Sequence, residues 1–391
     1  MAYDFDTIID RRGTHNEKWD GMEERYGVSP EEGLPMWVAD MEFRAPPEVN
    51  NAIRQAAEHG IHGYPGDSGS YHEAIVNWMQ RRHGWEIEPG WISTTHGIVN
   101  AVNLLIQAFC NPGDKVIVQP PVYYPFFGAI TGNGCQVVHH NLVQFDGRYM
   151  MDLLELDRLA DASTRMLILC SPHNPGGRVW SRAELAALAA ICIERDILMV
   201  SDEIHHDLVY EGYEHTVLAS LGPEVAERTI TCTSASKTFN LAGTMTGNVI
   251  ISNDSLRRRF QTQLHRCGIH APNKFGPMAA EAAYNHGEPW LKELLRYLKG
   301  NRDRVDEVVR KSLSGVVSMP LEGTYLAWLD FWGTGLDMKE IVKRVQEDAQ
   351  LALNHGPTFG PGGDKRMRLN FACPRPMLDE ALERLVEAFK G

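Results

Sequence analysis

The chain lacks a hydrophobic run long enough to cross a membrane. Its longest apolar stretch, AELAALAAICI, is shorter than the roughly 20 residues that a membrane helix needs. The first residues, MAYDFDTIIDRRGT, carry acidic side chains where a signal peptide needs an apolar core. We therefore expect no contact with a membrane and a cytoplasmic location.

The chain also lacks the positive charge of a nucleic-acid-binding protein. Asp and Glu number 51 against 38 for Lys and Arg, which gives a formal net charge of −13, and no block of basic residues is present. A protein that follows a phosphate backbone needs the opposite balance. We therefore expect no nucleic-acid partner.

Two cysteine and histidine patterns are missing as well. The seven cysteines are scattered and form no Cys-x-x-Cys pair, and the sixteen histidines show no His-Glu-x-x-His spacing. These absences argue against a disulfide framework and against a metal site. We expect reduced core thiols, histidines in surface or packing roles, and no bound metal.

What the chain does have is a series of short apolar runs separated by helical patterns. The runs cover 115–119, 166–170, 197–201, 229–233 and 248–252. Continuous apolar runs are typical of strands covered on both faces, which predicts a parallel α/β sheet. After about residue 285 the pattern changes to charged amphipathic helices and strand-like segments. We expect a large domain over 46–284, a small C-terminal domain over 285–391, and an N-terminal segment over 1–45 that packs on the small domain.

Four distinctive features each follow a predicted strand. They are Gly97 at the start of a helix, SPHNPGG (171–177), SDEIHHDL (201–208) and SASK (234–237). Ligands of an open α/β sheet bind beyond the carboxyl ends of its strands. The four features are therefore expected to converge on one crevice.

One cofactor, pyridoxal 5'-phosphate (PLP), would use all of these features. It needs an amine that bonds to its aldehyde, an acid that keeps its ring nitrogen protonated, and a donor to its phenolic oxygen. Lys237, Asp202 and Asn174 are the candidates for these roles. Each has a plainer alternative when taken alone: an exposed loop lysine, a helix-capping aspartate and an Asn-Pro turn. The joint spacing, 28 residues from Asn174 to Asp202 and 35 more to Lys237, favours the cofactor interpretation.

The phosphate of such a cofactor would need a cradle of donors. Gly97, Ile98 and Val99 begin a helix, so their backbone N–H groups could hold an anion. The hydroxyl groups of Ser234 and Ser236 could assist them.

These motifs, in this order and spacing, resemble the PLP-dependent aminotransferases of fold type I. The details are most similar to the MalY/PatB group of carbon–sulfur β-lyases, of the cystathionine β-lyase type. The most specific segments are RRGTHNEKWD (11–20) and LPMWVADMEF (34–43), followed by GTYLAWLDF (323–331) and RLNFACPR (368–375). The resemblance implies a large domain with a mainly parallel seven-stranded sheet and a smaller α+β domain.

The resemblance also implies further site residues. Tyr123 would stack on the cofactor ring, Arg368 would bind the α-carboxylate of the substrate, and Ala39 and Asp40 would line the substrate side. Tyr64 would reach the phosphate of the neighbouring subunit, so a homodimer with shared active sites is expected. Arg366, two residues before Arg368, is expected to point away from the site.

Two positions depart from the common aminotransferase pattern. Met245 stands eight residues after Lys237, where many of those enzymes have a phosphate-binding arginine. His205 stands where a tyrosine usually donates to the phenolic oxygen. We expect His205 to contact the cofactor, either as a substitute donor or by packing.

The resemblance implies an α,β-elimination of cystathionine or another L-cysteine conjugate, with Lys237 removing the α-proton. The products would be pyruvate, ammonia and a thiol. Three alternatives remain open: an aminotransferase, a specialised biosynthetic enzyme that performs substitution or cyclisation, and a non-enzymatic PLP-binding regulator. A regulator of that kind would carry a basic helix-turn-helix domain ahead of the PLP domain, and the residues before the first helix are not basic.

Overall fold

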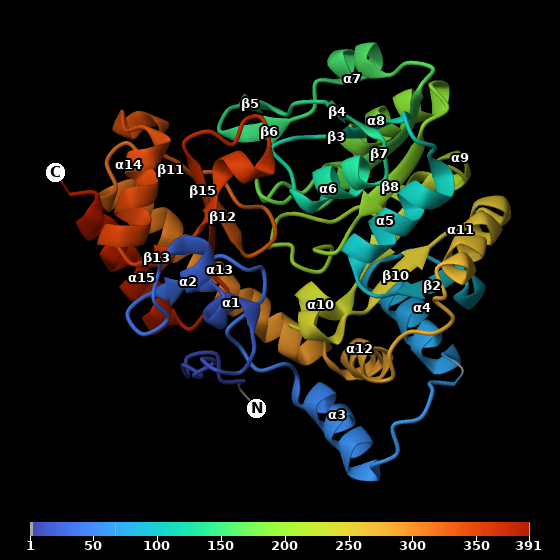
Figure 1. The fold of residues 1–391 in the computed structure, drawn as a ribbon, viewed down its shortest axis with the longest axis horizontal. Helices are drawn as coiled ribbons and strands as arrows, with labels where there is room; N and C mark the ends of the chain where they lie inside the picture. The colour runs from blue at the N-terminus through green and yellow to red at the C-terminus, as the bar shows by residue number, and fades with distance from the viewer. Residues whose placement is uncertain (1–2, 67, 391) are drawn as a thin grey trace.

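The computed structural model of the chain, which describes residues 3–66 and 68–390, has a mixed seven-stranded sheet at its centre (Figure 1). Its strand order is β2-β10-β9-β8-β7-β3-β4. The strands are β2 (Ile92–Thr95), β10 (Gly247–Ile250), β9 (Thr229–Thr233), β8 (Leu198–Asp202), β7 (Thr164–Cys170), β3 (Lys115–Val118) and β4 (Gln136–His139). The five apolar runs of the sequence thus all form strands, as predicted.

Helices cover both faces of this sheet. The α-helices of the described residues, of which only some pack on this sheet, are α1 (Glu17–Asp20), α2 (Met22–Tyr26), α3 (Pro47–His59), α4 (Gly69–His83), α5 (Ile98–Phe109), α6 (Pro125–Gly132), α7 (Leu153–Leu159), α8 (Arg182–Glu194), α9 (Pro223–Ala226), α10 (Ala235–Thr238), α11 (Asp254–Arg266), α12 (Phe275–His286), α13 (Glu288–Ser312), α14 (Met338–Lys343) and α15 (Arg375–Ala388). Residues of α5, α6 and α11 pack with Val116, Ile168 and Val200 on one face. Residues of α7 and α8 pack with Ile117 and Leu167 on the other. Because alternate strand residues face opposite sides, this arrangement explains the continuous apolar runs.

The mainly parallel, seven-stranded sheet that the resemblance implies is confirmed, and one strand departs from the parallel direction. β10 is antiparallel to both of its neighbours, β2 and β9, whereas the pairs from β9 to β4 are parallel. The chain between β9 and β10 holds only the short helix α10 and a 3₁₀ turn (Ala242–Thr244). It therefore turns back at the same edge of the sheet, where a parallel strand would need a full crossover.

A second, four-stranded sheet lies in the C-terminal part, in the order β11-β12-β15-β14. Its strands are β11 (Val317–Ser318), β12 (Leu326–Asp330), β15 (Arg366–Asn370) and β14 (Asn354–His355). The N-terminal segment lies against this part: β1 (Leu34–Pro35) pairs in parallel with β13 (Leu351–Ala352), and α1 and α2, in blue, lie beside the red and orange C-terminal elements in Figure 1. A small hairpin, β5 (Val143–Phe145) with β6 (Arg148–Met150), completes the strands. The predicted domain boundaries at 45 and 284 stay predictions.

A search of the described residues finds no helix that combines the length and apolarity of a membrane span. All seven cysteines are free thiols, and six of them are buried.

The N-terminus of α8 gives a test of the local structure. Ser181 accepts a hydrogen bond from the backbone of Glu184, whose side chain bonds back to the backbone of Ser181. We predict that Ser181→Ala lowers the free energy of unfolding by about 1 kcal/mol, because it removes one half of this capping box. Urea unfolding followed by circular dichroism measures the loss. Ser314→Ala, in the exposed turn after α13, is the matched control, and an equal loss in both variants would contradict the prediction.

Candidate active site

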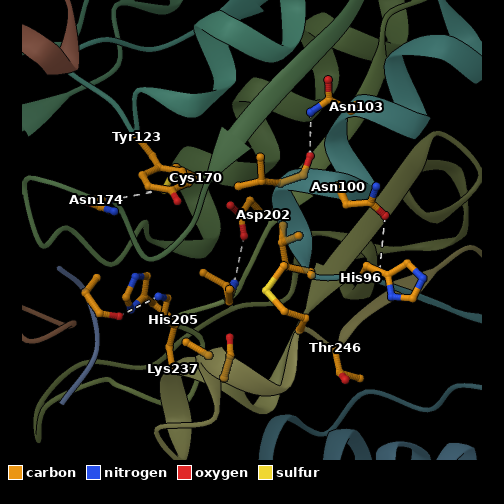
Figure 2. A pocket seen from close by; sticks show the side chains of 18 residues that line it. His96, Asn100, Asn103, Tyr123, Cys170, Asn174, Asp202, His205, Lys237 and Thr246 are labelled. Atoms are coloured by element: carbon orange, nitrogen blue, oxygen red, sulfur yellow. Dashed lines mark hydrogen bonds between the residues drawn. The ribbon is translucent and has the colours of Figure 1, made fainter. Parts of the chain in front are cut away.

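A cavity of about 470 Å³ opens at the carboxyl ends of β7, β8 and β9 (Figure 2). Ten of the predicted site residues line it: Ala39, Gly97, Ile98, Val99, Tyr123, Asn174, Asp202, His205, Ser236 and Lys237. The four features that follow strands in the sequence therefore do meet in one crevice. Seven lining residues were not predicted, namely His96, Asn100, Asn103, Cys170, Ile204, Ala242 and Thr246. Most of these lie within a few residues of a predicted position, and that proximity was the available signal.

Lys237 is positioned by the short helix α10, which follows β9. Its Nζ donates a hydrogen bond to the carbonyl oxygen of Ala39 at 2.6 Å, and the hydroxyl of Tyr325 donates to the same oxygen at 2.9 Å. Burial lowers the pKa of Lys237 to about 8, opposed by the negative charge of Asp40. The side chain that the sequence placed at a strand end is therefore an amine close to losing its proton at neutral pH.

The segment that carries Ala39 is held by side chains from distant parts of the chain. Asn370, on β15, donates to the carbonyl oxygens of Val38 at 2.6 Å and of Asp40 at 2.7 Å. Asn240, after α10, accepts from the N–H of Met41 and donates to its carbonyl oxygen, both at 2.9 Å. The acceptor for Lys237 is therefore fixed in place. Sequence reasoning missed these two asparagines and Tyr325, although Tyr325 and Asn370 lie within segments that it singled out.

Four charged side chains form a compact cluster beside this segment, and we call it the N-terminal quartet: Arg11, Lys18, Asp40 and Glu42. Arg11 contacts Asp40 and Glu42, each at 2.8 Å, and Lys18 contacts Asp40 at 3.3 Å and Glu42 at 2.9 Å. Burial alone would raise the pKa of Asp40, but Lys18 and Arg11 lower it below its usual value. The two cations and two anions therefore neutralise one another.

Asp202, at the end of β8, lines the cavity. Its Oδ1 accepts a hydrogen bond from the backbone of Ile204 at 3.2 Å. Burial raises its pKa to about 7, and the hydrogen bond from Ile204 and the positive charge of Lys237 offset this only in part. A carboxyl group in this state would be ionised by a cationic partner placed in the cavity.

Asn174 and Arg368 are joined, as Arg368 Nη1 donates to Asn174 Oδ1 at 2.9 Å. This bond fixes the amide so that its NH₂ group remains for the cavity. Nη2 of Arg368 donates to the carbonyl oxygen of Trp37 at 2.9 Å and to Asn354 Oδ1 at 2.5 Å. Nε of Arg368 is buried without a partner among residues 3–66 and 68–390. Arg368 thus lies behind the cavity wall with an N–H donor still free.

The helix α5 begins at the cavity with an uncapped N-terminus. Its N-cap residue, Gly97, has φ 85° and no side chain caps the first turn. Gly97 suits this backbone, which residues with a Cβ rarely adopt. Ser236 lines the cavity beside this turn. The free N–H groups and the helix dipole make the turn an anion site.

Ser234 does not line the cavity. Its hydroxyl donates to the carbonyl oxygen of Thr246 at 2.7 Å and accepts from the N–H of Ser236 at 3.0 Å. The hydroxyl therefore caps α10, and a direct contact with a phosphate is not what this geometry favours.

His205 and Tyr123 face the cavity from two sides. The His205 ring lies 5.8 Å from that of Tyr325 in an edge-on contact, and its Nδ1 is buried without a partner in the described part of the chain. Burial lowers the pKa of His205 well below its usual value, so the imidazole is neutral. His205 thus packs on Tyr325 and keeps one ring nitrogen unpaired among the described residues, and its role toward a cofactor stays a prediction.

Three other predicted residues lie outside this cavity. Asp40 lines an adjoining cavity instead. Tyr64 is fully exposed on the segment between α3 and α4. Arg366 forms an ion pair with Asp330 at 2.7 Å. Residues two apart on a strand share a face, so strand geometry does not turn Arg366 away from Arg368. The ion pair with Asp330 directs the side chain of Arg366 elsewhere.

Comparisons with known proteins agree with this geometry. The model of the family "Aminotransferase class I and II" matches residues 36–385. The chain belongs to this family. It is 41% identical to cystathionine beta-lyase PatB of Bacillus subtilis, over 98% of this chain and 99% of that protein.

Solved structures give the same result for the fold. Cystalysin from Treponema denticola, which contains a pyridoxal 5'-phosphate cofactor, has a TM-score of 0.96 at 37% identity, with 99% of both chains covered. The PLP-bound C-S lyase from Staphylococcus hominis has a TM-score of 0.92 at 32% identity, over 100% of this chain and 99% of that one. The family resemblance and the fold class predicted from the sequence are thereby confirmed.

The pKa of Lys237 can be tested in the cofactor-free protein. We predict that its acylation rises with pH around a midpoint near 8, because only the unprotonated amine reacts. Asp40→Asn should move the midpoint down by about 0.5 to 1 pH unit, since it removes a nearby negative charge that favours the ammonium form. Mass spectrometry of the labelled peptide measures both. Asp10→Asn, an exposed change in the same segment, is the control, and an unchanged or raised midpoint in Asp40→Asn would refute the assignment.

Proposed function

We propose that this chain is a PLP-dependent carbon–sulfur β-lyase, which cleaves cystathionine or another L-cysteine conjugate to pyruvate, ammonia and a thiol. The observation that carries the proposal is the meeting of Lys237, Asp202 and Asn174 around one cavity, closed by the segment that bears Ala39. This segment, LPMWVADMEF (34–43), is one of the two motifs most specific to the MalY/PatB group. The relationship to PatB over nearly the whole chain supports the same activity.

The residues of the cavity fit PLP. Asp202 is a buried acid with a raised pKa and, among residues 3–66 and 68–390, no ion-pair partner, and a protonated ring nitrogen would supply one. The NH₂ group of Asn174 suits the phenolic oxygen, and the first turn of α5 with Ser236 suits the phosphate. Tyr123, on the cavity wall, suits the ring face.

When bound, PLP withdraws electrons from the substrate α-carbon and so makes its proton acidic. The chain's own residues do the rest. Lys237 supplies the amine that holds the cofactor aldehyde and, once free, takes the proton from the α-carbon. Arg368, whose Nε is unpaired among the described residues, would bind the α-carboxylate and fix which substrate bond faces the amine of Lys237.

The net reaction breaks the bond between the β-carbon and sulfur. The thiolate leaves with the electron pair and gains a proton, and the remaining three-carbon fragment takes up water to give pyruvate and ammonia. No external oxidant or 2-oxo acid is required. Amino-group transfer is the second candidate, favoured by the family that the chain matches, and it differs in needing a 2-oxo acid.

We also propose a homodimer in which Tyr64 completes the site of the partner subunit. Tyr64 is fully exposed on a segment that α12 steadies through the bond from Lys274 Nζ to the carbonyl oxygen of Ile61 at 2.9 Å. Tyrosine is among the residues enriched at protein–protein interfaces, which supports this placement. A cytoplasmic location is proposed on the free state of all seven cysteines.

The lyase activity has a direct test. We predict that the PLP-loaded protein releases pyruvate and thiol in equal amounts from L-cystathionine without any added 2-oxo acid. Lys237→Ala should lose this activity by a factor of about 10³ or more, together with the cofactor absorbance band of the bound lysine. Lys299→Ala, on the exposed face of α13, should retain both. Turnover that depends on a 2-oxo acid would favour amino-group transfer instead.

The shared site has a separate test. Lys237→Ala and Tyr64→Ala should each have little activity alone. When the two variants are unfolded, mixed in equal amounts and refolded, random pairing makes about a quarter of all sites intact if each site takes residues from both subunits. Activity of the mixture, measured against each variant refolded alone, gives the result. A mixture no more active than the sum of its parts would refute the shared site.

A further inference from the structure

A second cavity adjoins the first on the side of the N-terminal segment. It has a volume of about 560 Å³ and shares Ala39, Lys237 and Ala242 with the first cavity. Its remaining wall comes largely from the segments around Arg11 and Asp40. The amine of Lys237 therefore lies at the boundary between the two cavities.

Under the proposed function, the first cavity is taken by the cofactor, and the substrate reacts beside Lys237. The substituent on the substrate sulfur then needs space next to Lys237 that the cofactor leaves free. The second cavity is such a space, and it reaches away from Asp202 and the first turn of α5. Its lining therefore bears on which thiols can leave.

Most charges on this lining are already compensated. Arg11, Asp40 and Glu42 belong to the N-terminal quartet, whose two cations and two anions contact one another. Glu17, also on the lining, pairs with Arg25 at 2.7 Å. These groups shape the wall but offer little net charge to a ligand.

Arg44 is the exception. It lines the cavity and is exposed, and within the described part of the chain its side chain forms no ion pair and no hydrogen bond. Its backbone is nonetheless fixed, because Asn240 donates to the carbonyl oxygen of the preceding Phe43 at 2.8 Å. The chain thus holds an uncompensated guanidinium at the rim of the space that adjoins the reacting amine.

We propose that the second cavity is the leaving-group subsite of the lyase, and that Arg44 selects thiols that carry a carboxylate. This inference rests on the proposed function and extends it to the substrate class. A guanidinium can bind a carboxylate through two parallel hydrogen bonds, which a neutral group of the same shape cannot match. An L-cysteine conjugate with an acidic substituent on sulfur is therefore preferred over a neutral one.

The test compares two conjugates of nearly equal size. One is S-(2-carboxyethyl)-L-cysteine, and the other carries the corresponding amide in place of the carboxylate. We expect the wild-type protein to favour the acid in kcat/KM by about 3- to 30-fold, and the preference to shrink at high salt. Arg44→Gln should bring the ratio near one, and Arg44→Lys should restore part of it. Arg12→Gln, which changes an exposed arginine paired with Asp10 and Glu31, should keep the wild-type ratio.

Binding gives a readout that does not depend on turnover. Titration of the cofactor absorbance with each conjugate yields two dissociation constants, whose ratio should follow the same order. A wild-type ratio near one, or a preference that survives Arg44→Gln, overturns the subsite. If neither conjugate nor cystathionine releases pyruvate, the proposed elimination fails, and the ratio of dissociation constants still decides whether Arg44 recognises the carboxylate.

Discussion

The candidate site depends on one partly buried hydrogen bond, from the amine of Lys237 to the carbonyl oxygen of Ala39 at 2.6 Å. An ammonium group in a protein interior is unstable unless a charge or a strong acceptor compensates it. Here the compensation is partial: Asp40 favours the charged form, while burial and the cation of Arg368 oppose it. The amine is therefore held in position and yet close to release of its proton, which is what covalent attachment to an aldehyde requires.

That hydrogen bond requires that the segment of Ala39 be held in place by residues far from Lys237 in the sequence. The carbonyl of Ala39 stays in place because Tyr325, Asn370 and Asn240 fix its segment. The N-terminal quartet adds ion pairs that are costly to bury one by one but neutral as a set. The N-terminal segment, the small sheet and the helix α10 are thus joined at the point where the reaction would occur.

The motif SDEIHHDL shows how charge compensation separates functional from structural acids. The carboxylate of Glu203 contacts Nε2 of His215 at 2.8 Å and accepts a hydrogen bond from the N–H of Leu218. These interactions lower the pKa of Glu203 despite its burial. The carboxylate of Asp207 contacts Arg82 and His83 and accepts a hydrogen bond from the hydroxyl of Thr238. The bond from Thr238 links Asp207 to α10. Among the described residues, the carboxylate of Asp202 accepts one hydrogen bond, from the backbone N–H of Ile204. The acid that the fold leaves uncompensated is the one that faces the cavity, as expected for a group awaiting a cationic ligand.

Sequence reasoning found the parts of the site that depend on local order. The features at 97, 174, 202 and 237 could be brought together because each follows a strand and parallel strands share a carboxyl edge. It could not predict the hydrogen bonds that hold the segment of Ala39, because these join residues far apart in sequence. It also could not predict that Ser234 caps α10, because the same hydroxyl group could instead have contacted a phosphate. The direction of β10 could not be predicted for a related reason. An apolar run indicates that both faces of a strand are buried, but it does not indicate whether the strand is parallel or antiparallel to its neighbours.

The absence of a cation at Met245 has a consequence for how the phosphate is held. Met245 lines the cavity beside Gly97, where it contributes no charge. The dipole of α5 supplies about half a positive charge at its N-terminus, which is less than a phosphate carries. In the proposed dimer the deficit is met by hydroxyl donors, those of Ser236 and of Tyr64 from the partner subunit. Retention of the cofactor would then depend on subunit association more strongly than in a family member that has an arginine at this position, because one of the few remaining donors is lost when the subunits separate.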